Sequence, residues 1–200
     1  MNRRRINKLK KKALSDEEIF NALSGHTRIF LYRDINDMNT IDDLFGNFDS
    51  VVILYEREPQ IGHWVGLLRR GNVIEFFDSY GIFPDLEKDY INQKFIMNSG
   101  QGFNKLASLL HDAWDLGYQV EYNNYGLQVM KDGISTCGRH VISRIWFKDM
   151  DIDEYNKFIN SFRKKGLNPD DVVSIMTQDI RLIMSKNDSQ LSLFSDSSLC

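Results

Sequence analysis

The side chains of Cys137, His63 and Asp78 have the types and the chain order needed for nucleophilic catalysis by a thiol. A cysteine attacks a carbonyl carbon as its thiolate, and a nearby imidazole accepts and returns the proton. A carboxylate beside the imidazole fixes its tautomer and orientation and supports its charged form. The three residue types therefore indicate thiolate chemistry, provided that the fold brings them together.

A β-hairpin is expected to place His63 beside Asp78. Two apolar segments, residues 63–68 and 73–78, flank Gly71-Asn72, a pair that suits a two-residue turn because both positions tolerate positive φ. This turn puts Asp78 on the same sheet face as His63, one diagonal step away, where Cβ atoms are roughly 7–8 Å apart or less. The alternative is that both are ordinary strand-end residues, and the pair alone does not decide between these interpretations.

The segment that begins at Cys137 predicts an amphipathic helix, because its apolar residues up to Trp146 fall on one stripe. A helix N-terminus lowers the pKa of a thiol through its exposed N–H groups and its dipole. Gly138 allows close backbone approach, and the N–H of Cys137 can face a developing oxyanion. A buried structural cysteine is the alternative, but His63 and Asp78 upstream favour a nucleophile.

Gln128 is the candidate donor for an oxyanion hole, and Gln119 competes for this role. An amide side chain can donate a hydrogen bond to a tetrahedral intermediate without changing its own charge. His140 and His111 fall within predicted helices, and we expect them to be structural.

The remaining pattern indicates an α+β fold with a central sheet. Short β-branched or alternating segments predict strands, and apolar residues at helical spacing between capping residues predict helices. The expected strands are residues 51–55, 63–68, 73–78, 118–122 and 127–129, and the expected helices are residues 15–23, 102–116, 137–146, 152–164 and 168–184.

Charge divides the chain into three expected parts. Residues 1–12 form a basic flexible arm, residues 13–186 a single catalytic domain, and residues 187–200, rich in Ser and Asp, a flexible tail. The remainder of the chain after the arm has 18 basic and 28 acidic residues. Clustered cations can bind a polyanion such as DNA, although a solvated tail is the alternative. The arm contains Arg3, Arg4, Arg5, Lys8, Lys10, Lys11 and Lys12.

The chain has only two cysteines, Cys137 and Cys200, so it is not a disulfide scaffold, and a reducing compartment is expected. No apolar run is long enough to span a bilayer, and the basic N-terminus lacks the apolar stretch of a secretory signal. We therefore expect a soluble, non-secreted monomer without a membrane partner.

Taken in order, several short motifs resemble the adenovirus maturation protease (adenain) family, with its relatives in large DNA viruses, virophages and polinton-like elements. The ubiquitin-like-protein (SUMO) proteases share the same order of catalytic residues. The matching segments are His63-Trp64-Val65-Gly66-Leu67, Phe76-Phe77-Asp78-Ser79-Tyr80-Gly81, Leu127-Gln128, Cys137-Gly138 and Asn168-Pro169-Asp170-Asp171-Val172-Val173.

The resemblance implies a papain-like, circularly rearranged cysteine protease fold, with a central mixed sheet flanked by helices. Cys137 would be the nucleophile, His63 the general base and Asp78 the orienting acid. Gln128 would line the oxyanion hole, and Trp64 would pack beside the site. Gln128 stands nine residues before Cys137, farther than is usual in the family, so either the intervening loop is longer or another group is the donor.

Family members cleave capsid and core precursors during virion maturation, so the expected locations are the virion and the host cytoplasm or nucleus. No cofactor is needed for the chemistry, and no metal is expected. The adenovirus enzyme is activated by DNA and a peptide, and either is an expected activator here. The competing functions are a ubiquitin-like-protein isopeptidase, an effector-type acetyltransferase, and a DNA- or capsid-binding structural protein.

Overall fold

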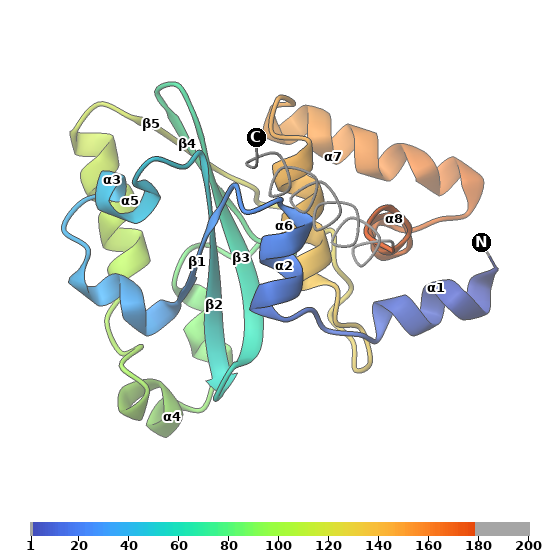
Figure 1. Cartoon of the computed structure of the whole chain (residues 1–200), viewed down its shortest axis with the longest axis horizontal. Coiled ribbons are helices and arrows are strands. Elements are labelled where there is room, and N and C mark those ends of the chain that lie inside the picture. The colour runs from blue at the N-terminus through green and yellow to red at the C-terminus, as the bar shows by residue number, and fades with distance from the viewer. Residues whose placement is uncertain (1, 179–200) are drawn as a thin grey trace, which may run out of the picture.

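A five-stranded mixed sheet forms the centre of the molecule in the computed structural model, which describes residues 2–178 (Figure 1). The strands lie side by side in chain order. The two outer pairs are parallel and the inner pairs are antiparallel. The strands are β1 (Arg28–Leu31), β2 (Ser50–Glu58), β3 (Ile61–Arg70), β4 (Val73–Phe77) and β5 (Gln119–Tyr122).

Helices cover both faces of the sheet, as the α+β prediction required (Figure 1). The α-helices are α1 (Arg3–Lys10), α2 (Asp16–Ala22), α3 (Ile41–Phe45), α4 (Gln93–Asn98), α5 (Lys105–Asp115), α6 (Cys137–Trp146), α7 (Ile152–Ser161) and α8 (Pro169–Met176). The 3₁₀ helices within residues 2–178 are η1 (Tyr32–Asp37), η2 (Leu86–Tyr90) and η3 (Phe162–Lys165).

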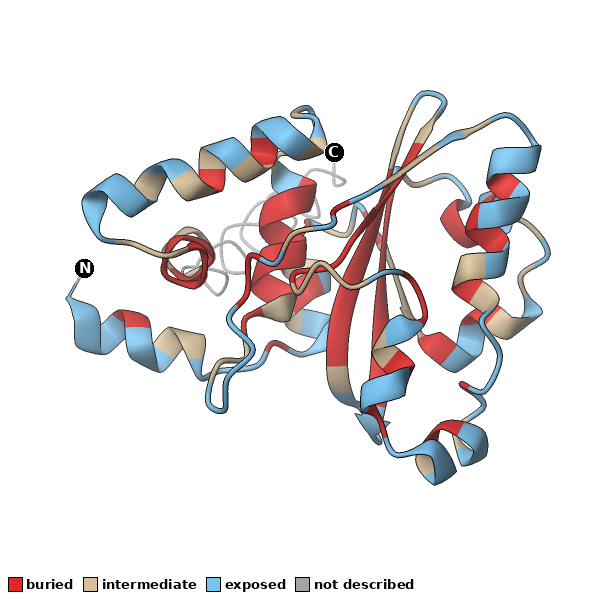
Figure 2. Cartoon of the chain, turned by 180° about the vertical axis from the view of Figure 1, so that it is seen from behind, coloured by how far each residue is buried: buried red, intermediate tan, exposed pale blue. Residues whose placement is uncertain are grey.

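Alternation along β2 divides the core into two layers. Val52 and Leu54 face the helices α2, α6, α7 and α8. Val51 and Ile53 face α3 and α5 on the other side, because successive strand side chains point to opposite faces. Figure 2 shows the consequence: α6 and the central strands are buried, whereas α5 exposes one side to solvent.

The predicted hairpin is confirmed. Arg70 pairs with Val73 across Gly71-Asn72, and the register continues to Gly66 opposite Phe77. Gly66 also lets α6 approach β3 closely, since a Cβ there would lie 3.1 Å from a methyl carbon of Val141. Helix α6 therefore crosses β3 directly, which brings its N-terminus to the end of the strand that carries His63.

The prediction of a flexible arm at residues 1–12 is wrong for residues 3–10, which form α1 with Asn2 as its N-cap. Helix α1 packs on α8. Asp171 on α8 forms ion pairs with Arg3 at 2.6 Å and with Lys10 at 2.8 Å. A buried carboxylate needs such cations, and this pairing holds the segment in place. The expected tail at 187–200 and the predicted helix beyond 178 lie outside the described residues.

The predicted strand at Leu127-Gln128-Val129 is also wrong. The N–H groups of Leu127 and Gln128 both donate to the carbonyl of Ser79, each at 2.8 Å. The N–H of Val129 donates to the Asp170 carboxylate at 3.1 Å. Successive amides that converge on one carbonyl and then on a side chain cannot form a ladder, so the segment is a loop. It nevertheless runs beside the end of β4.

Candidate active site

The imidazole of His63 is hydrogen-bonded to the carboxylate of Asp78, with 2.8 Å between Nε2 and Oδ1. Both side chains are buried. His63 belongs to β3, and Asp78 follows the last residue of β4. The predicted meeting of the two residues across the hairpin is therefore confirmed. With Nε2 bound to the carboxylate, Nδ1 is the ring nitrogen that remains for another partner.

The thiol of Cys137 lies beside the His63 ring, near enough for each group to shift the pKa of the other. Cys137 is the first residue of α6 and is only partly buried, and it lines the cavity described below. The backbone N–H groups of Trp64 and Gly138 also lie near the sulfur and help to lower the pKa of the thiol. The predicted position at a helix N-terminus is confirmed.

These contacts shift the pKa values of the pair in opposite directions. Burial by itself lowers the pKa of His63, but the Asp78 carboxylate and the Cys137 sulfur together raise it well above the ordinary value. Burial raises the pKa of Cys137, yet the hydrogen bond and charge of His63 and the two backbone N–H groups lower it on balance. Both shifts favour a thiolate beside an imidazolium.

Asp78 and Tyr80 hold the imidazole in place. The Asp78 Oδ1 atom also accepts the N–H of Tyr80 at 2.7 Å. The Tyr80 ring stacks on His63 with centroids 4.6 Å apart. Asn123 accepts the N–H of Asp78 at 2.9 Å and donates to its carbonyl at 2.6 Å. No local pattern singles out Asn123, because it meets Asp78 from 45 residues away, and Tyr80 has no predicted role of its own.

Gln128 lies in the same site, and its amide is oriented by two hydrogen bonds. Its Oε1 accepts the Ser79 hydroxyl at 2.7 Å, and its Nε2 donates to the Tyr80 hydroxyl at 3.0 Å. A primary amide has two N–H donors, so one remains for a ligand in the cavity that Gln128 shares with Cys137.

Gln119 lies away from these residues. It begins β5, where it pairs with Val73 at the hairpin end of β4, and its amide donates to Glu121 at 2.6 Å. Asp78 follows the opposite end of β4. The competing assignment of Gln119 to the oxyanion hole is therefore not supported.

Trp64 and Gly138 pack against each other beside the thiol. A Cβ on Gly138 would lie 3.3 Å from the Trp64 ring and 3.2 Å from a methyl of Ile19, so a side chain there would push α6 away from β3. The Trp64 Nε1 donates to the Leu14 carbonyl at 3.1 Å. This bond ties the segment between α1 and α2 to the site.

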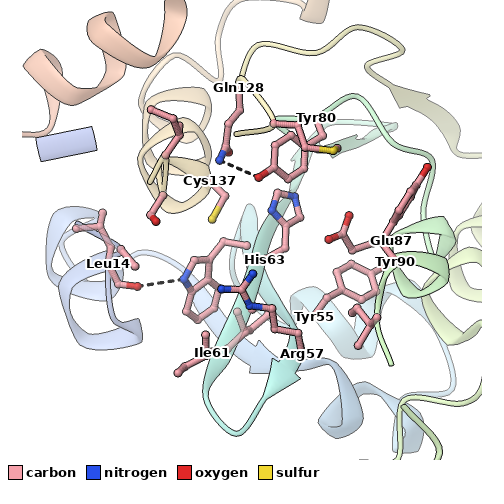
Figure 3. Close-up of a pocket in the computed structure, with 18 of the residues that line it drawn as sticks. Leu14, Tyr55, Arg57, Ile61, His63, Tyr80, Glu87, Tyr90, Gln128 and Cys137 are labelled. Atoms are coloured by element: carbon pink, nitrogen blue, oxygen red, sulfur yellow. Dashed lines mark hydrogen bonds between the residues drawn. The ribbon is translucent and has the colours of Figure 1, made fainter. Parts of the chain in front are cut away.

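A cavity of about 320 Å³ opens over these groups (Figure 3). It is a cleft that a peptide segment can enter. The residues lining it are Ala13, Leu14, Leu54, Tyr55, Arg57, Gln60, Ile61, Gly62, His63, Trp64, Tyr80, Glu87, Tyr90, Ile91, Gln128, Met130, Ile134, Ser135 and Cys137.

A second buried histidine–carboxylate pair, His140 and Asp170, lies next to the site. Asp170 accepts from His140 at 3.1 Å and from the Thr136 hydroxyl at 2.5 Å. Its other oxygen accepts the N–H of Val129. Asp170 therefore joins three segments: the start of α6, the loop that carries Gln128, and the start of α8. His140 is buried among these contacts and makes none with Cys137, in line with a structural role.

Two groups of side chains in the described part of the chain could offer ligands to a metal ion. Donor atoms of His63, Asp78 and Glu87 lie within 4.8 Å of one another, and so do those of an exposed group on α5, His111, Asp112 and Asp115. None of the helices within residues 2–178 is long and apolar enough to cross a membrane.

Comparison with known proteins gives one clear relationship. No family model matches the chain. The crystal structure of ASFV pS273R protease overlaps it with a TM-score of 0.44 at 14% identity, over 84% of this chain and 67% of that one. The uncharacterized protein V9 of Sputnik virophage is 34% identical over 171 residues, which are 84% of this chain and 95% of V9. This identity and coverage place the chain in the same protein family as V9 of Sputnik virophage.

Proposed function

We propose that the protein is a cysteine endopeptidase. The observation that carries this proposal is the arrangement of Cys137, His63 and Asp78: a thiol at a helix N-terminus lies beside the imidazole, and a carboxylate bonds the imidazole Nε2 at 2.8 Å. The thiol faces an open cleft. These groups suit a papain-like mechanism, and the α+β arrangement suits a rearranged papain-like fold.

In this mechanism the Cys137 thiolate attacks the scissile carbonyl carbon. As negative charge develops on the carbonyl oxygen, this oxygen accepts hydrogen bonds from the N–H of Cys137 and from the free amide N–H of Gln128. The His63 imidazolium then donates its proton to the leaving amine, the C–N bond breaks, and a thioester forms. A water molecule gives its proton to His63 and attacks the thioester, and its collapse releases the acid and restores the ion pair.

We further propose that the substrates are viral capsid or core precursors cleaved during virion maturation, in the virion or at the site of assembly in the host cytoplasm or nucleus. The family tie to a virophage protein supports a viral role. Incubation with precursor proteins should release defined fragments. Cleavage of ubiquitin-like conjugates instead would point to an isopeptidase, and acetyl transfer from acetyl-coenzyme A to an acetyltransferase.

The reactivity of the thiol tests the proposal without knowledge of the substrate. Iodoacetamide near neutral pH should alkylate Cys137 much faster than Cys200, as read by mass spectrometry, because only Cys137 has an imidazole partner in the proposed site. His63→Ala should remove the difference. Equal, slow labelling of both cysteines in the wild-type chain would instead favour a DNA- or capsid-binding structural protein.

We also propose that α1 binds DNA without sequence preference and that DNA or a peptide serves as an activator. Three of the seven basic residues already pair with acids, Arg3 and Lys10 with Asp171 and Lys12 with Glu18. The other four are exposed and line one shallow hollow; they are Arg4, Arg5, Lys8 and Lys11. Binding of arbitrary duplex DNA should weaken steeply with salt and should be lost when these four are changed to Ala. Salt-independent binding would contradict this.

A further inference from the structure

Glu87 is a carboxylate in the cleft that no other described residue neutralises at close range. It lies on η2 and lines the cavity. Within residues 2–178 it makes no hydrogen bond or ion pair. One of its oxygens lies within 4.8 Å of donor atoms of both His63 and Asp78. Arg57 also lines the cavity and attracts this carboxylate, but it is exposed and forms no bond with Glu87.

The neighbours of Glu87 on η2 explain why it faces the cleft. Asp85, just before η2, accepts from the Tyr55 hydroxyl at 3.1 Å and from the Ala107 N–H at 2.8 Å. Lys88 turns to the interior, where its ammonium donates to the Phe103 carbonyl at 2.7 Å. These two buried residues anchor the turn. Glu87 is therefore held at the cleft wall by contacts that do not involve its own carboxylate.

Cleft geometry places Glu87 on the side of the departing half of a substrate. The acyl half stays on the Cys137 sulfur, and His63 protonates the amine that leaves. The leaving nitrogen must therefore lie near Nδ1 of His63, next to the thiol, and the residues that follow it continue past His63. Figure 3 shows His63 between Cys137 and Glu87, and the proximities agree, since His63 lies beside the thiol and close to Glu87.

Burial raises the pKa of Glu87, and the nearby charge of Asp78 adds to this, while His63 and Arg57 oppose it. A carboxylate that has lost water without gaining a partner is stabilised by a cation. Tyr90 lines the same cavity with an exposed ring. An aromatic face beside a carboxylate accommodates both the alkyl stem and the charge of Lys or Arg.

We propose that Glu87 selects substrates that carry Lys or Arg just after the scissile bond, with its carboxylate pairing with the side-chain cation. This inference rests on the proposed endopeptidase function and names the class of sequence on its leaving-group side. Glu87 is a specificity residue in this role, because it contacts a side chain of the substrate and not the reacting atoms.

The test is a digest of a complex peptide mixture, with the cleavage sites identified by mass spectrometry. Wild-type protein should enrich Lys and Arg in the first two positions after the cut by about fivefold or more over neutral residues, the scale of a partly exposed ion pair. Glu87→Gln should abolish the enrichment, and Glu87→Lys should turn it toward Asp and Glu. Glu58→Gln, an exposed carboxylate outside the cavity lining, should retain the wild-type pattern.

Two other outcomes are distinct. Cleavage without enrichment, or enrichment that survives Glu87→Gln, would overturn the assignment of Glu87 and leave the endopeptidase intact. Uniform slowing of all peptides by Glu87→Gln would also overturn it, because Glu87 would then act through His63. If unlabelled protein cleaves no peptide, although Cys137 in a parallel sample reacts selectively with iodoacetamide, the endopeptidase proposal is rejected instead.

Discussion

At the scale of single residues, the imidazole of His63 lies between the carboxylate of Asp78 and the thiol of Cys137. His63 bonds Asp78 through Nε2 and lies beside the thiol of Cys137. The carboxylate raises the pKa of the imidazole, and the resulting cation lowers the pKa of the thiol. The ion pair therefore exists between a lowered thiol pKa and a raised imidazole pKa, and activity should follow a bell-shaped dependence on pH.

Asp78→Asn should narrow this pH window from the alkaline side. The alkaline limb should move to lower pH because His63 loses the charge that raises its pKa. The acid limb should not move to higher pH, because His63 is protonated along that limb in both proteins. The maximal rate should fall roughly 10²- to 10⁴-fold. Alkylation rate of Cys137 against pH measures both limbs, and unchanged limbs would show that Asp78 does not act on His63.

Gln128→Ala should slow peptide cleavage by about 10²-fold, the usual effect of removing one oxyanion donor. Alkylation of Cys137 should stay near the wild-type rate, because attack on iodoacetamide develops no oxyanion. Gln119→Ala is the matched control. Gln119 on β5 pairs with the end of β4 that is far from Asp78, so this substitution should leave cleavage unchanged. Equal loss in both reactions would mean that Gln128 only supports the fold.

At the scale of elements, Asp170 and Asp171 are neighbours on α8 that hold different parts of the molecule. Asp170 binds Thr136 and Val129, which fixes the start of α6 against the loop of Gln128. Asp171 binds Arg3 and Lys10 of α1. One turn of helix therefore joins the site on one side and the N-terminal helix on the other.

Asp170→Asn should destabilise the protein by about 2 kcal/mol or more, since three donors lose a charged acceptor. Burial raises the pKa of Asp170, but the bonds from His140, Thr136 and Val129 lower it on balance. A carboxylate with a lowered folded-state pKa stabilises above its unfolded pKa and loses this contribution as pH falls through the folded value. Urea unfolding should therefore show a wild-type advantage near neutral pH that disappears in acid.

The same variant should slow cleavage beyond the loss of stability, because the Gln128 loop is released. Asp171→Asn, one residue along, should destabilise the docking of α1 but leave the cleavage rate of the folded protein closer to wild type. Equal effects of the two substitutions on cleavage would argue against a positioning role for Asp170.

Local signals predicted the hairpin and most helices, but not the elements that depend on distant partners. The turn at Gly71-Asn72 and the stripe after Cys137 are encoded within a few residues. Strand β1 was not predicted, because its four residues have no alternation and are all half-buried at the edge of the sheet. The loop at Leu127-Gln128-Val129 looks like a strand until Ser79 and Asp170 supply its partners.

The candidate site also contains residues that local signals predict and residues that depend on distant partners. His63, Asp78 and Cys137 could be found from residue type, hairpin register and helix position. Glu87 could not, since nothing near it in the sequence sets it apart from other exposed acids. Its significance depends on a turn anchored by Asp85 and on a cavity wall assembled from several elements.

At the scale of the whole molecule, the N-terminal segment completes the body. Ile6 of α1 is buried, and the Lys10 carbonyl accepts the N–H of Ser135 at 2.7 Å, two residues before Cys137. The Leu14 carbonyl then accepts the indole N–H of Trp64. Lys10 thus contacts the segment that leads to the nucleophile, although composition alone predicts a flexible basic arm at residues 1–12.

Deletion of residues 1–12 should lower Tm and also slow the alkylation of Cys137, because Ser135 loses its anchor. Calorimetry and labelling measure the two effects. Changing Arg4, Arg5, Lys8 and Lys11 to Ala should leave Tm nearly unchanged, since exposed side chains contribute little to stability, while removing any DNA binding. A deletion variant as stable as the wild type would contradict the structural role of α1.

The separation of the two halves of the site along the chain makes reactivity a late product of folding. The hairpin that joins His63 to Asp78 is a local structure that forms in about 1–10 μs, whereas Cys137 arrives only when α6 docks across β3. Before that step the thiol has neither an imidazole nor the Trp64 N–H. The thiol of an incompletely folded chain should therefore react slowly. During refolding, the rise in the alkylation rate of Cys137 should report the docking of α6 on β3.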